Sequence, residues 1–154
     1  MHDLAIKLKL EGFNELLKEI EKAGEKIEPV TKNVLEQSAN IMQEELKSQM
    51  QKSDVPKNLI NEMPPPTVEE DSGLFTAHVG YKKGTYNPHN LSNGYKVVFL
   101  NYGTPYRKKH GKIKDVSEGG KIKLGFITRA KNKAKKKITT QQENALKEIL
   151  KGLK

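Results

Sequence analysis

The segment from residue 29 to residue 50 constrains the fold more than any other part of the chain. Pro29 suits the first turn of a helix, and small or apolar side chains then recur every three or four residues. The stripe consists of Val30, Val34, Leu35, Ser38, Ala39, Met42, Leu46 and Met50. Because this spacing puts its members on one side of a helix, we predict a long amphipathic helix that buries that side.

Two other segments repeat the helical spacing. Before residue 29, apolar residues recur among paired Glu and Lys side chains, which predicts a helix ending near Ile27: Phe13, Leu16, Leu17, Ile20 and Ile27. After residue 129, an apolar side continues to the end of the chain, although Thr139 and Thr140 can break or kink it: Ala130, Ala134, Ile138, Ala145, Leu146, Ile149, Leu150 and Leu153. We therefore expect two N-terminal helices and a long C-terminal helix.

Alternating side chains predict a small sheet. Leu4, Ile6, Leu8 and Leu10 alternate with less apolar residues and are followed by Gly12, as in a strand with one buried face. Residues 74–81 alternate as well, with Leu74, Thr76 and His78 on one face and Phe75, Ala77, Val79 and Tyr81 on the buried face. Residues 122–127 are a possible further strand, and periodicity leaves residues 95–102 open between a strand and a helical turn. The fold class predicted is α+β, with a small antiparallel sheet packed against the helices.

The remaining segments read as loops in a single domain. Periodicity stops at residue 51, and four prolines with an acidic run predict a long connection over about residues 51–73. Residues 84–94 form a second loop, and residues 103–121 form a basic, glycine-containing one. A chain of 154 residues favours one domain, because a second would leave each half too little apolar surface to bury.

The charge is distributed unevenly along the sequence. Residues 1–72 hold nine basic and fifteen acidic side chains, a net charge of −6, whereas residues 73–154 hold nineteen and four, a net charge of +15. Only 34% of the residues are hydrophobic, so we expect a thin core and a large polar surface that a partner can cover. The basic half can attract nucleic acid or an acidic protein face.

Motifs for catalysis and for metal or cofactor binding are absent from the sequence. There is no cysteine, no His-Glu-x-x-His and no Gly-x-Ser-x-Gly, and the four histidines lack the short spacings of a metal site. Gly119-Gly120-Lys121 has Asp115 where a phosphate loop needs its first glycine and Ile122 where it needs a hydroxyl. No apolar stretch is long enough to span a membrane. We expect no enzymatic activity, no cofactor and no membrane partner.

Two clusters of basic residues leave two interpretations open. One cluster comprises Lys131, Lys133, Lys135, Lys136 and Lys137, and the other comprises Arg107, Lys108, Lys109, Lys112 and Lys114. They can form a solvated helix face and an exposed loop, or they can contact phosphates or an acidic protein face. With only two arginines and no interleaved aromatic residues, base-specific recognition of nucleic acid is disfavoured.

A turn at Gly103 is the tightest local signal. In the segment 100–105, Gly103 can adopt a positive φ angle, and Pro105 forces Thr104 to be extended, so the chain leaves an apolar segment sharply. This segment, together with Gly125-Phe126-Ile127-Thr128-Arg129-Ala130 and the charged terminal helix, resembles the phage HK-97 gene-product-10-like family. These are small neck proteins of long-tailed phages, described as head-tail joining or tail-completion proteins.

The resemblance covers nearly the whole chain but has two departures. Tyr102, Gly103 and Thr104 match, whereas the family typically has an acidic residue where Asn101 stands and a proline where Gly125 stands. A salt link at Asn101 is therefore in doubt. The family's Gly-x-Leu entry to its sheet corresponds either to the segment 72–74 or to a position near Leu59.

The resemblance implies a structural protein that works in assembly without catalysis, as a subunit of a ring in the head-tail junction of the virion, after synthesis in the host cytoplasm. Its implied partners are other phage neck and tail proteins, further copies of itself and the DNA backbone in the channel. In such a ring, an acidic helix face with Glu15, Glu19, Glu44 and Glu45 can meet basic residues of the next copy. The candidate assembly residues are Tyr102, Gly103, Thr104, Arg107, Lys108, Lys109, Phe126, Arg129, Lys133, Lys135, Lys136 and Lys137. The alternative is a basic accessory protein that binds nucleic acid through the run from Lys131 to Lys137.

Overall fold

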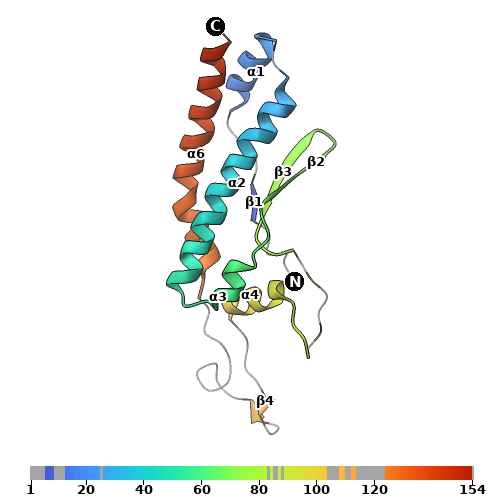
Figure 1. Ribbon diagram of the computed structural model, residues 1–154, viewed down its shortest axis with the longest axis vertical. Helices are drawn as coiled ribbons and strands as arrows, with labels where there is room; N and C mark the ends of the chain where they lie inside the picture. Colours follow the sequence, from blue (N-terminus) through green and yellow to red (C-terminus); the bar gives the residue numbers. More distant parts are fainter. Residues whose placement is uncertain are drawn as a thin grey trace.

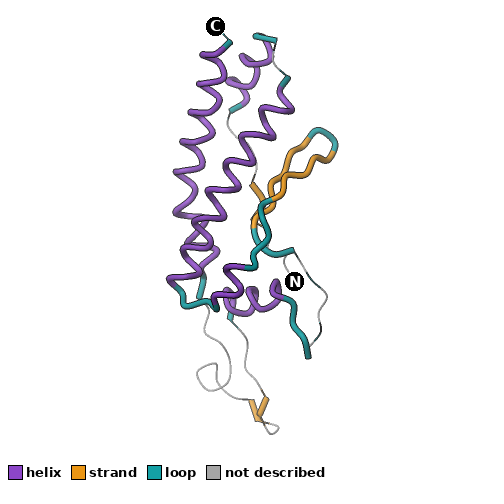
Figure 2. Tube along the Cα trace, in the orientation of Figure 1, coloured by secondary structure: helices purple, strands orange, loops and turns teal. Residues whose placement is uncertain are grey.

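The computed structural model is an α+β arrangement in three layers (Figures 1 and 2). It describes residues 6–8, 13–24, 26–82, 84, 87, 89–103, 108–109, 112–113 and 124–153. The elements in chain order are β1 (Ile6–Leu8), α1 (Asn14–Lys22), α2 (Ile27–Lys52), α3 (Lys57–Asn61), β2 (Thr67–Asp71), β3 (Leu74–Val79), α4 (Asn93–Tyr102), β4 (Lys108–Lys109), β5 (Lys112–Ile113) and α6 (Phe126–Gly152). The predicted fold class is confirmed.

Helices α2 and α6 form the antiparallel pair on which the other elements are placed. They contain 26 and 27 residues, so each is about 40 Å long. Helix α2 is the middle layer, because it packs against α6 on one side and against β3 on the other. Figure 1 shows α6 on the left and the β2–β3 hairpin on the right, with α2 between them. The stripe predicted for residues 29–50 is thus buried on a helix that extends slightly beyond both ends of the prediction.

The core consists of two apolar clusters. The larger one joins α2, α3, α4, β3 and the start of α6, and Leu35, Met42, Met50 and Phe126 are among its fully buried side chains. The smaller one lies where α1 covers the other end of the pair, and its buried members are Ile20, Val34, Leu146 and Leu150. Burial of these side chains is the main stabilising contribution, at roughly 1.5 to 3 kcal/mol for each large one.

A buried polar layer lies along the α2–α6 interface. The Gln142 amide donates to Ser38 Oγ at 3.0 Å, and Ser38 Oγ lies within 2.9 Å of two acceptors, Gln141 Oε1 and the carbonyl of Val34. Gln141 in turn donates to Gln37 at 2.7 Å. Because these groups find partners only when the two helices are aligned in this way, the layer favours one register of the pair.

The three-stranded sheet has the order β1-β3-β2, and both pairings are antiparallel. In β3, Ala77 and Val79 are fully buried while Leu74 is exposed, which confirms the predicted alternation. Ser72 and Gly73 join β2 to β3 with φ angles of 51° and 80°, and two consecutive positive φ angles are what a two-residue type I′ hairpin turn requires.

Two predictions about element boundaries were wrong. The first helix ends at Lys22, since Gly24 takes a φ of 92° there, and Ile27 begins α2 instead. The segment 51–73 is not a continuous loop, because it contains α3 and β2. Each of these elements has only five residues, too few for a periodic signal, yet Leu59 and Ile60 of α3 are buried in the core.

The prediction of a strand over residues 122–127 was also wrong where the structure describes that segment. Phe126 is the first residue of α6, and Leu124 and Gly125 are not in a strand. Residues 95–102, which periodicity left open, lie in α4. Helix α6 continues through Thr139, whose hydroxyl donates to the carbonyl of Lys135 at 3.0 Å within the same helix, so no break occurs. Apart from Gly103, β4 and β5, the predicted loop 103–121 lies outside the described residues.

Candidate assembly surfaces

The turn after α4 has the geometry that its sequence predicted. Helix α4 ends at Tyr102, and Gly103 follows with φ 77° and ψ 175°. This region of backbone conformation is accessible essentially only to glycine. The predicted positive φ at Gly103 is therefore confirmed.

The two segments that carry the family resemblance meet at this turn. The amide of Leu124 donates to the carbonyl of Leu100 at 3.2 Å, and the amide of Gly125 donates to the carbonyl of Asn101 at 3.0 Å. The end of α4 thus holds the start of α6, although more than twenty residues separate them in the sequence.

Asn101 completes this junction with its side chain. Only 1% of Asn101 is exposed, and its Oδ1 accepts a hydrogen bond from the amide of Ile127 at 3.0 Å. The first amides of a helix have no partner within the helix, so Asn101 acts as an N-cap supplied from another element. A carboxylate, the family's typical group here, is also an acceptor suited to a helix N-terminus. The described partner of Asn101 Oδ1 is a backbone amide, and no sequence motif predicts this hydrogen bond.

Two of the candidate assembly residues make contacts within the fold. Phe126 is fully buried in the larger core cluster. The guanidinium of Arg129 donates to the carbonyl of Leu124 at 2.5 Å and to Ser53 Oγ at 2.6 Å. It therefore joins the first turn of α6 to the end of α2, and both residues stabilise the junction that positions Gly103.

Tyr102, by contrast, projects from the junction. It is 54% exposed, and Leu74 is the other large apolar side chain with the same exposure in the described part of the chain. Tyr102 sits at the last position of α4, beside the constrained Gly103. An exposed aromatic side chain on a rigid element is a suitable contact for another protein.

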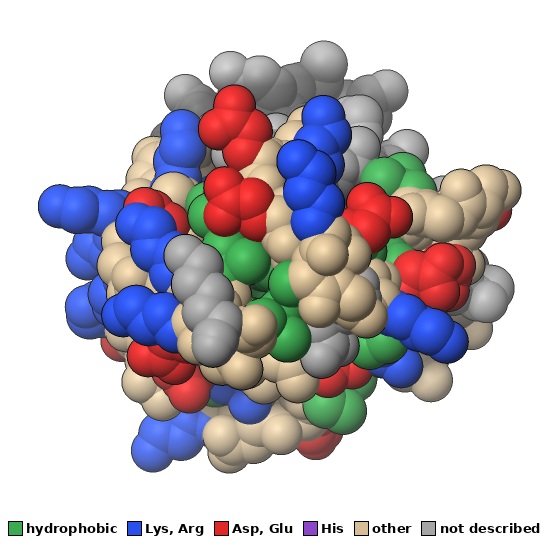
Figure 3. Space-filling model, turned by 90° about the horizontal axis from the view of Figure 1, so that it is seen from above, with side chains coloured by type: hydrophobic (Ala, Val, Ile, Leu, Met, Phe, Trp, Pro, Cys, Tyr) green, Lys and Arg blue, Asp and Glu red, His purple; other side chains and the backbone are tan. Residues whose placement is uncertain are grey.

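The lysines of α6 surround its solvent side rather than lining one face. Successive helical residues are turned by about 100°, so Lys133 and Lys137 lie on one flank of the buried stripe and Lys131 and Lys135 on the other. Lys136 lies between these flanks, and all five side chains are exposed. In Figure 3, basic side chains gather along the left edge, the side occupied by α6 in Figure 1.

One flank is engaged within the chain. Lys137 Nζ lies 3.3 Å from the carboxylate of Glu45, which is largely buried on α2. The pKa of the Glu45 carboxyl is lowered, first because the Gln49 amide donates a hydrogen bond to it at 3.1 Å. The Lys137 and Lys133 ammonium groups lower this pKa further, whereas the partial burial of the carboxyl acts to raise it. Glu45 is thus paired within its own chain. Lys131, Lys135 and Lys136 form no ion pair with any part of the chain that the structure describes.

The hairpin on the opposite side of the molecule is acidic. Glu69 lies 3.4 Å from His78 and 3.6 Å from Lys82, whereas Glu70 makes no ion pair among the described residues. Asp71 accepts a hydrogen bond from the hydroxyl of Ser72 at 3.0 Å. All of these acidic side chains are exposed.

The other candidate residues are less informative. Thr104 and Arg107 lie outside the described residues, as does Gly119-Gly120-Lys121, while Lys108 and Lys109 form β4, which pairs with β5. Within the described ranges, no group of three or more acidic or histidine side chains is placed to hold a metal ion. His78 faces Glu69, and His89 lies in an exposed turn.

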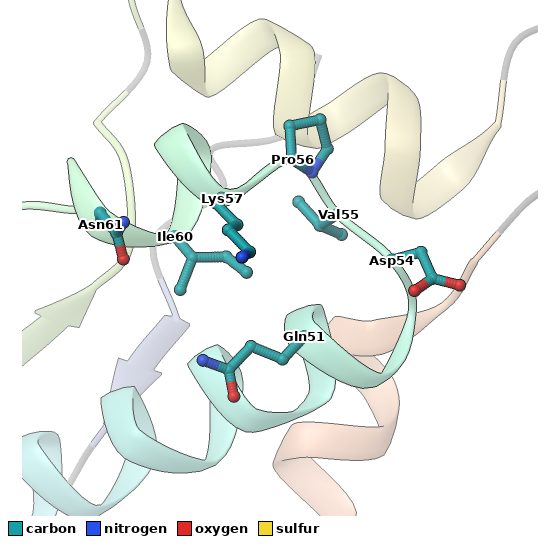
Figure 4. A pocket seen from close by; sticks show the side chains of 7 residues that line it. All are labelled: Gln51, Asp54, Val55, Pro56, Lys57, Ile60 and Asn61. Carbon is teal, nitrogen blue, oxygen red and sulfur yellow. The ribbon is translucent and has the colours of Figure 1, made fainter.

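An open pocket of about 450 Å³ lies between the end of α2 and α3. Figure 4 shows Val55 and Ile60 on its apolar part and Asp54 pointing away from it. Its other lining residues are Gln51, Pro56, Lys57 and Asn61. We assign this pocket no chemistry.

Comparisons with family models, with curated proteins and with solved structures found no match. None of the helices in the described part of the chain combines the length and hydropathy that crossing a membrane requires. The fold and the positions of the candidate residues are thus the observations on which a functional proposal rests.

Gly103→Ala should lower the free energy of unfolding by about 1 to 3 kcal/mol, because a side chain is strained at this φ and ψ. Urea denaturation followed by circular dichroism measures the change. The control is Gly152→Ala, at the end of α6, where an added Cβ meets nothing within 4 Å and stability should be equal or higher. Equal stability of Gly103→Ala and the parent would show that the turn has no special geometry.

Asn101→Leu should destabilise the chain by about 1 to 2 kcal/mol, because the amide of Ile127 loses its acceptor. Asn101→Asp should lower the stability less than Asn101→Leu does, since a carboxylate accepts the same hydrogen bond and interacts favourably with the helix N-terminus. Thermal unfolding of both variants at neutral pH provides the comparison. The account of the junction would be wrong if the two variants lost the same stability.

Proposed function

We propose that this chain is a structural subunit of the head-tail junction of a tailed bacteriophage, acting as a head-tail joining or tail-completion protein in a ring of identical copies. It works without catalysis. The protein is synthesised in the host cytoplasm and becomes part of the virion. Its partners are other neck and tail proteins, further copies of itself and the DNA backbone in the channel.

The observation that carries the proposal is the junction at Asn101 and Gly103. The resemblance to the neck-protein family rests on two short segments, 100–105 and 125–130, that are distant in the sequence. In the fold these segments bond to each other through Leu124, Gly125 and Ile127, and they set where α6 begins. Two motifs that form one structural unit support the resemblance better than two independent matches do, because a chance match has no reason to bring them together.

A second observation concerns the shape of the charge distribution. A ring of identical subunits needs two different and complementary sides on each copy. Helix α6 and the β2–β3 hairpin lie on opposite sides of α2 (Figure 1). The first carries the exposed lysines and the second carries exposed acidic side chains. This arrangement suits head-to-tail contacts, with surplus positive charge left for the phosphates of DNA.

The exposed lysines of α6 also favour a second candidate, a basic accessory protein that binds nucleic acid. Lys131, Lys135 and Lys136 form no ion pair with the described residues and are available to phosphates. Salt-dependent DNA binding by a lone monomer, without any requirement for phage partners, would favour this candidate over the ring subunit.

The proposed function predicts a defect in joining when the protein is missing. Extracts of the phage or induced prophage lacking this gene should accumulate separate heads and tails, and adding the purified chain should restore infectious particles. Gly152→Ala should restore them as well as the parent, because an added Cβ there meets no described side chain within 4 Å. Normal infectious particles in extracts without the protein would refute the proposal.

A further inference from the structure

The described residues leave opposite charges without partners at two distant places. On α6, Lys131, Lys135 and Lys136 are exposed and make no ion pair within the described ranges. On the hairpin, Glu70 and Asp71 are exposed and have no basic partner among the residues that the structure describes. Since α2 separates the two groups, these charges do not meet within one chain.

The hairpin also carries an apolar group where the acidic side chains lie. Leu74 is paired with Asp71 in the strand register, so both side chains are on the same face of the hairpin, together with Glu69. Leu74 is 54% exposed. An apolar side chain flanked by carboxylates matches a lysine-covered helix, because lysine presents an aliphatic stem and a charged end.

The acidic residues of α1 are a weaker match. Glu15 and Glu19 are exposed, but α1 packs against the same α6 helix in its own chain. A contact from this side does not connect opposite sides of successive copies. The exposed Leu74 is also on the hairpin, and α1 carries no large apolar side chain that is as exposed.

We propose that the exposed tip of the β2–β3 hairpin docks on the Lys131, Lys135 and Lys136 surface of α6 in a second copy of this chain. Asp71 and Leu74 lie on the outer face of this tip, and Glu70, paired with Phe75, lies on the other face. The contact is head-to-tail, so every copy gives its hairpin to one neighbour and receives the hairpin of the other. The inference rests on the proposed ring and names the surfaces that build it. The hairpin takes the place of the acidic helix face that was expected from the sequence at this contact. One member of that face, Glu45, is already paired with Lys137 in the same chain.

Charge reversal tests the pairing through a mixing experiment. The hairpin variant carries Glu70→Lys and Asp71→Lys, and the helix variant carries Lys135→Glu and Lys136→Glu. Each variant alone should lose self-association, because its two surfaces then have the same sign, whereas an equal mixture should regain it, because each altered surface meets an opposite one. The matched control, Glu15→Lys with Glu19→Lys, changes the charge equally on α1 and should associate as the parent does.

Single cysteines make weak contacts measurable, since the chain has no cysteine of its own. A copy with Ser72→Cys is mixed with a copy carrying Asn132→Cys, a substitution that leaves the lysines of α6 intact. The mixture is held at high concentration and low salt, and a short bismaleimide cross-linker is added. The 72–132 dimer should form in several-fold higher yield than the dimer of Asn14→Cys with Asn132→Cys, and the excess should disappear at high salt.

Equal yields for the two cysteine pairs, or a mixture of reversed variants that associates no better than either alone, would overturn the hairpin docking. Such a result leaves the proposed function standing if the purified chain still joins heads to tails. Conversely, a specific 72–132 cross-link in a protein that phage particles do not need would support the docking and refute the joining function.

Discussion

The antiparallel packing of α2 on α6 is the constraint on which the rest of the structure depends. Each helix buries one side against the other, and the Ser38 and Gln142 layer between the two apolar clusters favours one alignment along their length. With that alignment fixed, α1 covers one end of the pair, and α3 and α4 lie at the other. The sheet then takes the remaining side of α2, which places the hairpin opposite α6.

The junction at Asn101 determines where α6 begins and therefore which of its residues face solvent. Asn101 accepts from the amide of Ile127, and Arg129 bonds to Ser53 at the end of α2. Held at its first turn, α6 turns Ala130, Ala134 and Ile138 inward and leaves the lysines outside. A local hydrogen-bonding arrangement thus sets the charge pattern of a surface about one to three turns further along α6.

How far the sequence predicts the fold depends on the length of each pattern. The stripe of α2 spans more than five helical turns, and the alternation of β3 ends in the buried Ala77 and Val79, so both were predictable. Helix α3 and strand β2 are stabilised by tertiary contacts that a five-residue window does not contain. In the candidate site, the positive φ angle of Gly103 was predictable from the local sequence around it. The roles of Asn101, Phe126 and Arg129 depend on contacts between separate elements.

Electron cryo-microscopy of the chain assembled at high concentration, or of the neck of the phage particle, tests the central claim most directly. We predict a closed ring of identical subunits in which the hairpin tip at Ser72 of each copy lies against α6 of its neighbour. A two-fold dimer that joins the same surface of both copies, or particles whose neck lacks this chain, would contradict the account.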